Sequence, residues 1–235
     1  MPVLLLAQGD SQAKDLLRSA IESRYGFKPP ALQALQLELK GKMLARIGPV
    51  SSWLPITVTA QFKLPLAFRW EYTVRLSGMP VRRGRQAYDG LVLRYDEGGE
   101  PVVETDARII HSVQKRLWAA MAALLTPLTE GFVTLHSPDD RILEATNHET
   151  DDTVQLTLGD DSMLHAVQTL AYNPQADEDQ WFKIELANRH MTFDDFILPA
   201  SVTVSWDDEP YLELEPVGVE VNCHLPDTLF TLEED

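Results

Sequence analysis

Residues Ser112 to Leu125 read SVQKRLWAAMAALL, and this stretch decides the expected fold. Apolar residues recur along it at the spacing of one helical face: Val113, Leu117, Met121, Leu124 and Leu125. Alanines fill the other faces, and beyond Arg116 the only hydrogen-bonding side chain is the indole of Trp118. A helix that is apolar nearly all round belongs inside a protein. The sequence therefore predicts a buried helix over 112–125.

Strand-like segments surround this helix in the sequence. Before it, apolar and polar residues alternate with a period of two over 35–43, 56–64 and 66–76. Such alternation is typical of antiparallel strands with one face in the core and the other in solvent. Shorter or looser strands are expected around 85–88, 91–95, 101–110, 153–158, 164–172, 182–186, 201–206 and 217–223. Pairs of aspartates between the later runs indicate turns.

The expected fold class is α+β, with a large curled antiparallel sheet (an open or half barrel) wrapped around the central apolar helix. A sheet with this many strands must curl, split or close, because twist accumulates from strand to strand. An N-terminal amphipathic helix, capped by Asp10 or Ser11 and ended by Gly26, is expected to pack on the outside. The predicted organisation is a helical segment over 1–30, a half-barrel domain over 31–228 and an acidic tail over 229–235.

Composition excludes several classes of protein. The chain carries 36 acidic and 20 basic residues, a formal net charge of −16. This balance makes a nucleic-acid partner a poor match and argues against electrostatic docking on anionic lipid. A single cysteine, Cys223, cannot form an internal disulfide.

The opening residues, MPVLLLA, lack the positive region and the apolar length of a signal peptide. No run approaches the length of a membrane span. The sequence as it stands predicts a cytoplasmic protein without a membrane span, and export stays open if a signal has been removed. The oligomeric state is not predicted.

No linear motif predicts catalysis, a metal or a cofactor. The histidines are scattered without a zinc-binding spacing, and the acidic doublets lack the alternating ligands of a calcium loop. Ser112 and Lys115 match the S-x-x-K pattern of penicillin-recognising enzymes, but its companion motifs are absent, so we interpret Ser112 as a helix cap. We expect a non-enzymatic protein with no cofactor, although a site assembled across strands would leave no linear motif.

The aromatic residues provide the most informative functional pattern. Four of them fall on the apolar faces of adjacent strands: Phe62, Phe68, Trp70 and Tyr72. They are either packed core or the lining of a slot for a ligand, and Trp118 and Met121 of the helix complete the candidate lining. A basic cluster in an acidic chain, Arg82, Arg83 and Arg85, is a candidate contact for an anionic headgroup, with an exposed hairpin edge as the simpler interpretation.

Several short motifs resemble a bacterial family of unknown function. They are Leu198–Trp206 (LPASVTVSW) followed by Val217–Asn222, the Phe68-Arg69-Trp70 strand after Pro65, Tyr88-Asp89-Gly90, and Trp181. That family is similar in architecture to the lipoprotein carriers, which wrap an open sheet around helices and hold acyl chains. The resemblance implies a binder of hydrophobic ligands. The chain departs from the family where its helix keeps Trp118 without the neighbouring Glu and Pro, and carriers of this class are exported.

Two functional hypotheses follow. The first is a non-enzymatic protein that buries a lipid or other apolar small molecule between the concave sheet face and the central helix. The candidate contacts are Phe62, Phe68, Trp70, Tyr72, Trp118, Met121, Arg82 and Arg85. The second is a structural or protein-interaction module with a fully packed core, in which the first helix would be a docking element.

Overall fold

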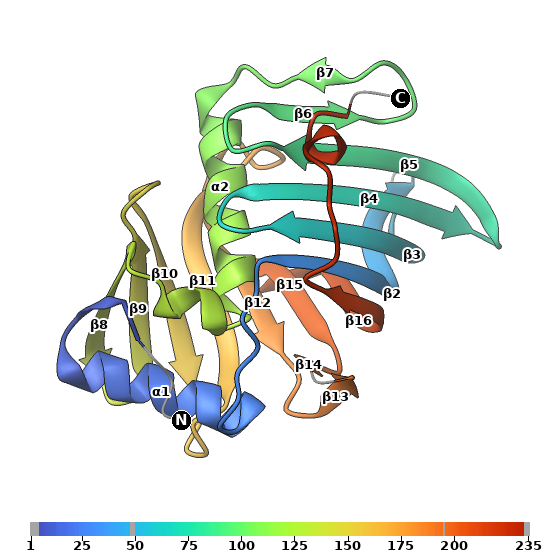
Figure 1. Ribbon diagram of the computed structural model, residues 1–235. Helices are drawn as coiled ribbons and strands as arrows, with labels where there is room; N and C mark the ends of the chain where they lie inside the picture. The colour runs from blue at the N-terminus through green and yellow to red at the C-terminus, as the bar shows by residue number, and fades with distance from the viewer. Residues whose placement is uncertain (1–4, 48–49, 195, 233–235) are drawn as a thin grey trace. The chain divides into compact units, whose positions relative to one another are not determined.

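The computed structural model describes residues 5–47, 50–194 and 196–232 (Figure 1). The first four residues of the opening run, one residue of the Asp194–Asp195 doublet and the last three residues of the predicted tail lie outside these ranges. The chain divides into two compact units. The first unit contains the residues up to Ala31 and those from His111 to Glu209, and the second contains Leu32 to Ile110 and the residues from Pro210 onward.

The first unit holds seven strands of the large sheet, a two-stranded ribbon, the first α-helix, and the second α-helix from His111 onward. Its sheet strands neighbour one another in the order β1 (Gln8–Gly9), β8 (Val133–Asp139), β9 (Ile142–Asn147), β10 (Asp152–Leu158), β11 (Leu164–Asn173), β12 (Glu178–Leu186) and β15 (Val202–Trp206). β1 pairs parallel with β8, and the later pairs are antiparallel. The ribbon consists of β13 (His190–Phe193) and β14 (Phe196–Pro199).

The N-terminal amphipathic helix is present as α1 (Ser11–Tyr25). The Asp10 side chain accepts a hydrogen bond from the Ala13 N–H at 2.7 Å, and Gly26 ends the helix. The apolar face of α1 is fully buried, with Leu17 and Ile21 inaccessible to solvent. This face is therefore occupied in the core and is not free to dock a partner.

The buried helix is α2 (Ala107–Ala122), which begins five residues earlier than predicted. Its start is set by Asp106, whose carboxylate accepts from the Arg108 N–H at 2.8 Å. The strand expected over 101–110 is reduced to β7 (Val102–Val103). Ser112 lies inside the helix, so its interpretation as a cap is wrong; its hydroxyl donates to the Tyr172 carbonyl at 2.6 Å.

Side chains of α2 bond to the backbone of the sheet beneath it. Besides Ser112, the Lys115 ammonium donates to the Leu170 carbonyl on β11 at 2.9 Å, and the Trp118 indole donates to the Ala145 carbonyl on β9 at 3.1 Å. The two residues of the S-x-x-K pattern therefore fix the helix to β11. After α2 the chain turns through a short 3-10 helix, η1 (Thr126–Thr129).

The second unit holds the other seven strands of the large sheet. Their order is β16 (Glu209–Val221), β2 (Ala34–Ile47), β3 (Val50–Lys63), β4 (Ala67–Leu76), β5 (Met79–Tyr88), β6 (Leu93–Asp96) and β7, and all these pairs are antiparallel. The three alternating runs of the sequence are β2, β3 and β4. Their apolar residues lie in shared cross-strand rows, because Ile56 pairs with Val74 and Val58 with Tyr72.

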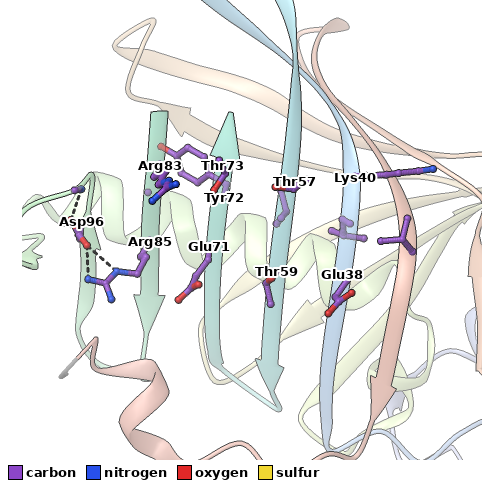
Figure 2. A pocket seen from close by; sticks show the side chains of 15 residues that line it. Glu38, Lys40, Thr57, Thr59, Glu71, Tyr72, Thr73, Arg83, Arg85 and Asp96 are labelled. Carbon is purple, nitrogen blue, oxygen red and sulfur yellow. Dashed lines mark hydrogen bonds and ion pairs between the residues drawn. The ribbon is translucent and has the colours of Figure 1, made fainter. Parts of the chain in front are cut away.

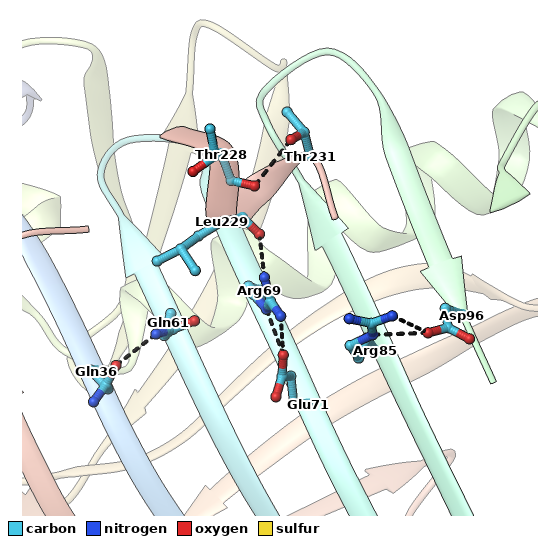
Figure 3. Close-up of polar contacts among 9 residues, drawn as sticks. All are labelled: Gln36, Gln61, Arg69, Glu71, Arg85, Asp96, Thr228, Leu229 and Thr231. Atoms are coloured by element: carbon cyan, nitrogen blue, oxygen red, sulfur yellow. Dashed lines mark hydrogen bonds and ion pairs between the residues drawn. The ribbon is translucent and has the colours of Figure 1, made fainter. Parts of the chain in front are cut away.

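A segment after β16 packs on the polar face of β2 to β5 (Figure 3). It contains a 3-10 helix, η2 (Asp227–Phe230), whose Leu229 carbonyl accepts from the Arg69 guanidinium at 3.0 Å. Phe230 is only 1% exposed and Leu232 2%. These residues fall in the predicted acidic tail, but their apolar side chains belong to the core of this unit.

The fold class is thus α+β, with a large, mostly antiparallel sheet, an N-terminal amphipathic helix and a buried apolar helix, as predicted. The domain boundaries after residues 30 and 228 stay predictions. Neither described helix has the length and apolar character needed to cross a bilayer.

Replacing the α2 tryptophan tests its structural role. We expect Trp118→Ala to lower the free energy of unfolding by about 3–5 kcal/mol, because the ring is 3% exposed and its removal leaves a cavity. Trp181→Ala is the matched control: this ring is 47% exposed on β12, and a change of about 0.5 kcal/mol is expected. Urea unfolding followed by circular dichroism measures both, and equal losses would contradict the assignment.

Candidate ligand-binding site

Four predicted site residues lie together on the apolar face of β3 and β4. Phe62 pairs with Phe68 across the two strands, and Trp70 and Tyr72 follow Phe68 at every second position of β4. We call these four residues the aromatic patch. Phe68 is buried against Tyr88, with ring centroids 6.5 Å apart, whereas the other three members are only partly buried. The patch is therefore not fully used as packed core.

Aliphatic side chains of β2 extend the aromatic patch. Leu37 pairs with Ala60, which pairs with Trp70, so the three lie in one cross-strand row. Leu39 lies in the next row with Val58 and Tyr72. Leu37 and Leu39 also remain partly exposed. Small and β-branched residues on the middle strand thus separate large, partly accessible side chains on its two neighbours.

Tyr72 has a defined position at the margin of the patch. It pairs with Gly84 on β5, and a Cβ atom at position 84 would lie 2.6 Å from the tyrosine ring, so the glycine allows this close approach. The Arg82 guanidinium lies 5.9 Å from the ring centroid and forms an ion pair with Glu97. Burial raises the pKa of Tyr72, so the phenol is neutral at physiological pH. Arg82 thus places a cation beside the aromatic patch.

Arg85, the other predicted headgroup contact, faces away from the aromatic patch. It pairs with Glu71, which alternates with Trp70 and Tyr72 along β4 and therefore points to the opposite face. Its guanidinium donates to one oxygen of Asp96 at 2.8 and 2.6 Å. The structure thus brings together Phe62, Phe68, Trp70, Tyr72 and Arg82, and it places Arg85 elsewhere.

The Asp96 carboxylate is held by four donors. Besides Arg85, the N–H groups of Gly98 and Gly99 donate to its other oxygen at 2.6 and 2.7 Å. These hydrogen bonds, that from Arg85 first, hold the pKa of Asp96 below its ordinary value. The Asp96 side chain is 5% exposed. Its bonds to Arg85 on β5 and to Gly98 and Gly99 hold the loop after β6 against β5.

A groove of about 530 Å³ crosses the polar face of the same strands (Figure 2). Two cross-strand rows of side chains form its floor. One row contains Glu38, Thr59, Glu71, Arg85 and Asp96, and the other contains Lys40, Thr57, Thr73 and Arg83. The groove was not predicted, because the polar positions of alternating strands look alike in sequence whether they line a hollow or a flat surface.

Most charges of the groove already have partners. Glu71 accepts from Arg69, Lys40 lies 3.6 Å from Glu215, and Arg85 is bound to Asp96 (Figures 2 and 3). Within the described ranges, no three His, Cys, Asp or Glu side chains are placed to hold a metal ion. The hydroxyls and paired charges of the groove suit polar contacts.

The two helix residues of the predicted lining lie in the first unit. Trp118 and Met121 are each 3% exposed. The Trp118 indole N–H donates to the Ala145 carbonyl, and the ring centroids of Trp118 and Phe132 lie 6.3 Å apart. Both residues are therefore buried and belong to the first unit, where Trp118 packs, while the aromatic patch belongs to the second.

Comparison with known proteins identifies the fold. No protein-family model and no curated protein matches the chain. A DUF1329 family protein from Desulfovibrio piger aligns over 94% of this chain and 98% of its own, with a TM-score of 0.52 and 10% identity. A LolA superfamily protein from Nitrosomonas europaea aligns over 93% and 96%, with a TM-score of 0.52 and 14% identity.

A third structure, a domain from Vibrio parahaemolyticus named for outer membrane lipoprotein sorting, aligns over 93% of this chain and 97% of its own, with a TM-score of 0.50 and 8% identity. At these identities the likeness shows the fold. The resemblance to a family of unknown function with lipoprotein-carrier architecture is confirmed at that level.

The hydrogen bonds that Asp96 accepts from Arg85, Gly98 and Gly99 predict a specific dependence of stability on pH. Asp96→Asn should lower the free energy of unfolding at neutral pH by about 1–3 kcal/mol, because it removes a charge-assisted bond from Arg85. The depressed pKa of the folded state means that the carboxylate stabilises the fold above its unfolded pKa of about 3.9 and loses this contribution as pH falls through the lower folded value. The difference between the two proteins should therefore be constant at neutral pH and shrink in acid.

Chemical unfolding at a series of pH values measures this difference. Asp160→Asn is the control, because Asp160 forms an exposed ion pair with Arg141. A difference between wild type and Asp96→Asn that persists undiminished in strong acid would contradict the assigned role of the carboxylate.

Proposed function

We propose that this protein is a non-enzymatic binding protein that holds a lipid or other hydrophobic small molecule against the aromatic patch. The observation that carries the proposal is the partial exposure of Phe62, Trp70 and Tyr72 on the apolar face of β3 and β4. Other residues of this face are buried: Ile56, Val58, Ala60, Phe68 and Val74. Apolar rings that keep accessible surface favour an apolar guest, because burial of each methylene group contributes about 0.8 kcal/mol.

The fold supports the same class of function. A domain named for outer membrane lipoprotein sorting shares it, and lipoproteins carry acyl chains. An acyl chain laid along Leu37, Leu39, Trp70 and Tyr72 would need no charged partner for affinity. Arg82 beside Tyr72 is the proposed contact for an anionic headgroup, since its guanidinium is exposed and, among the described residues, pairs with a single carboxylate, that of Glu97.

The proposal revises the predicted lining. Arg85 is left out because it faces the polar groove, and Trp118 and Met121 are left out because they are buried residues of the first unit. The predicted cytoplasmic location stays a prediction, and the proposed binding does not depend on the compartment.

Uptake of a fluorescent fatty acid tests the proposed site. The double variant Trp70→Ser/Tyr72→Ser should bind it at least about tenfold more weakly than wild type, because two apolar contacts worth more than about 1.4 kcal/mol are removed. Native mass spectrometry of the protein as purified should show a lipid adduct that the variant lacks.

Glu71→Gln is the matched control, because Glu71 lies between the two aromatic residues in sequence and points to the opposite face. It should leave uptake unchanged. Circular dichroism distinguishes lost binding from lost folding. The absence of both an adduct and fatty-acid uptake in wild type would reject the proposal and favour a structural module with a packed core.

A further inference from the structure

The hairpin ends of the second unit combine exposed apolar side chains with basic ones. The last described pair of β2 and β3, Ile47 with Val50, and the last pair of β4 and β5, Leu76 with Met79, lie at the same end of the strands, beyond the Ile56–Val74 pair. We define the hairpin ends as residues 42–46, 50–53 and 75–83. Five large hydrophobic side chains there are exposed: Leu44, Val50, Leu76, Met79 and Val81.

Positive charge is concentrated in the same segments. The sequence carries no aspartate or glutamate from residue 39 to 58 or from 72 to 88, although acidic residues outnumber basic ones 36 to 20 in the whole chain. The basic residues of the hairpin ends are Lys42, Arg46, Arg75, Arg82 and Arg83. The hairpin ends therefore carry a local excess of positive charge, although the net charge of the whole chain is −16.

Some of these cations are neutralised by carboxylates from other segments. Lys42 lies 3.0 Å from Glu213, and Arg82 pairs with Glu97. Arg75 instead contacts the Thr57 hydroxyl at 3.5 Å, and Arg83 is an exposed lining residue of the polar groove (Figure 2). Within the described residues, neither Arg75 nor Arg83 forms an ion pair with a carboxylate. A positive surface therefore remains after pairing.

We infer that the hairpin ends dock on an anionic lipid surface. Apolar side chains at the turns would enter the headgroup region, and the arginines beside them would meet lipid phosphates. Leu76 and Met79 occupy the last pair before the Ser77–Gly78 turn, so they project from an end and not from a flat face. This placement suits insertion into a lipid interface better than the broad complementary contact of a protein partner.

Charge favours lipid over a second copy of the chain. Two copies of a cationic surface repel one another, whereas an anionic leaflet attracts each Lys or Arg near it. The acidic remainder of the molecule does not cancel this attraction, since charges more than about 8 Å away are largely screened at physiological ionic strength. The inference can be separated from the proposed function, because the aromatic patch contributes none of the hairpin-end residues and Arg82 alone is used by both.

Vesicle flotation with the full chain tests the inference. Wild type should float with phosphatidylcholine vesicles that contain phosphatidylglycerol, should bind pure phosphatidylcholine far less, and should be released by added salt. Leu76→Ser/Met79→Ser should weaken binding to the anionic vesicles about tenfold through lost apolar insertion. Arg75→Glu/Arg83→Glu should weaken it by at least as much.

Matched controls come from the first unit. Leu170→Ser removes a side chain that is 44% exposed on β11, and Arg141→Glu/Arg189→Glu reverses two exposed arginines. Both should bind like wild type. Trp70→Ser/Tyr72→Ser should keep vesicle binding while losing fatty-acid uptake, which separates this inference from the proposed function.

Three results would overturn the inference. They are a wild-type protein that does not distinguish anionic from neutral vesicles, hairpin-end variants that bind like wild type, and controls that lose binding equally. Light scattering provides a further test. A wild-type dimer that the hairpin-end variants disperse, without any vesicle binding, would identify this surface as an interface between copies.

Discussion

The alternation of side chains along β2 to β5 is the constraint on which the rest of the second unit depends. Neighbouring residues of a strand point to opposite faces, and the antiparallel register places like faces together across four strands. Tyr72 therefore lies on the apolar side, while Glu71 and Thr73 line the polar groove. One short sequence thus supports two surfaces of different chemistry, and a register shift of one residue would exchange them.

The same alternation explains what was predictable from the sequence. The alternating runs predict β2, β3 and β4 because period-two hydrophobicity is a local signal, and Asp10 is predictable as a cap of α1 because it bonds within one turn. The sequence pattern does not predict the start of α2, because Ile109 and Ile110 resemble strand residues and the start is set by the single side chain of Asp106. The interpretation of Ser112 as a cap has the same cause, because a strand that ends at Ile110 would place the start of the helix near Ser112.

The site was predictable only in part, because sites depend on contacts between distant residues. Parity placed Phe62, Phe68, Trp70 and Tyr72 together, which is a property of the strands alone. The faces of Arg82 and Arg85 follow only from the strand pairing. Because Gly84 pairs with Tyr72, Arg82 lies on the same face as Tyr72 and Arg85 lies on the opposite face. No local pattern indicates that Arg85 hydrogen-bonds to Asp96. Nor does any local pattern indicate that Phe230 and Leu232, in the predicted acidic tail, are buried in the core.

The pairing of β16 with β2 has a consequence for how the protein forms. These neighbours in the second unit are separated in the chain by the main segment of the first, from His111 to Glu209. During synthesis, the edge of β2 therefore has no strand to pair with until β16 has been made, while β2 to β7 are already available to one another. An unpaired edge on an alternating strand is a template for aggregation, and closing so long a loop slows folding. The lysines at positions 40 and 42, which later meet Glu215 and Glu213, place charge along that edge during the interval.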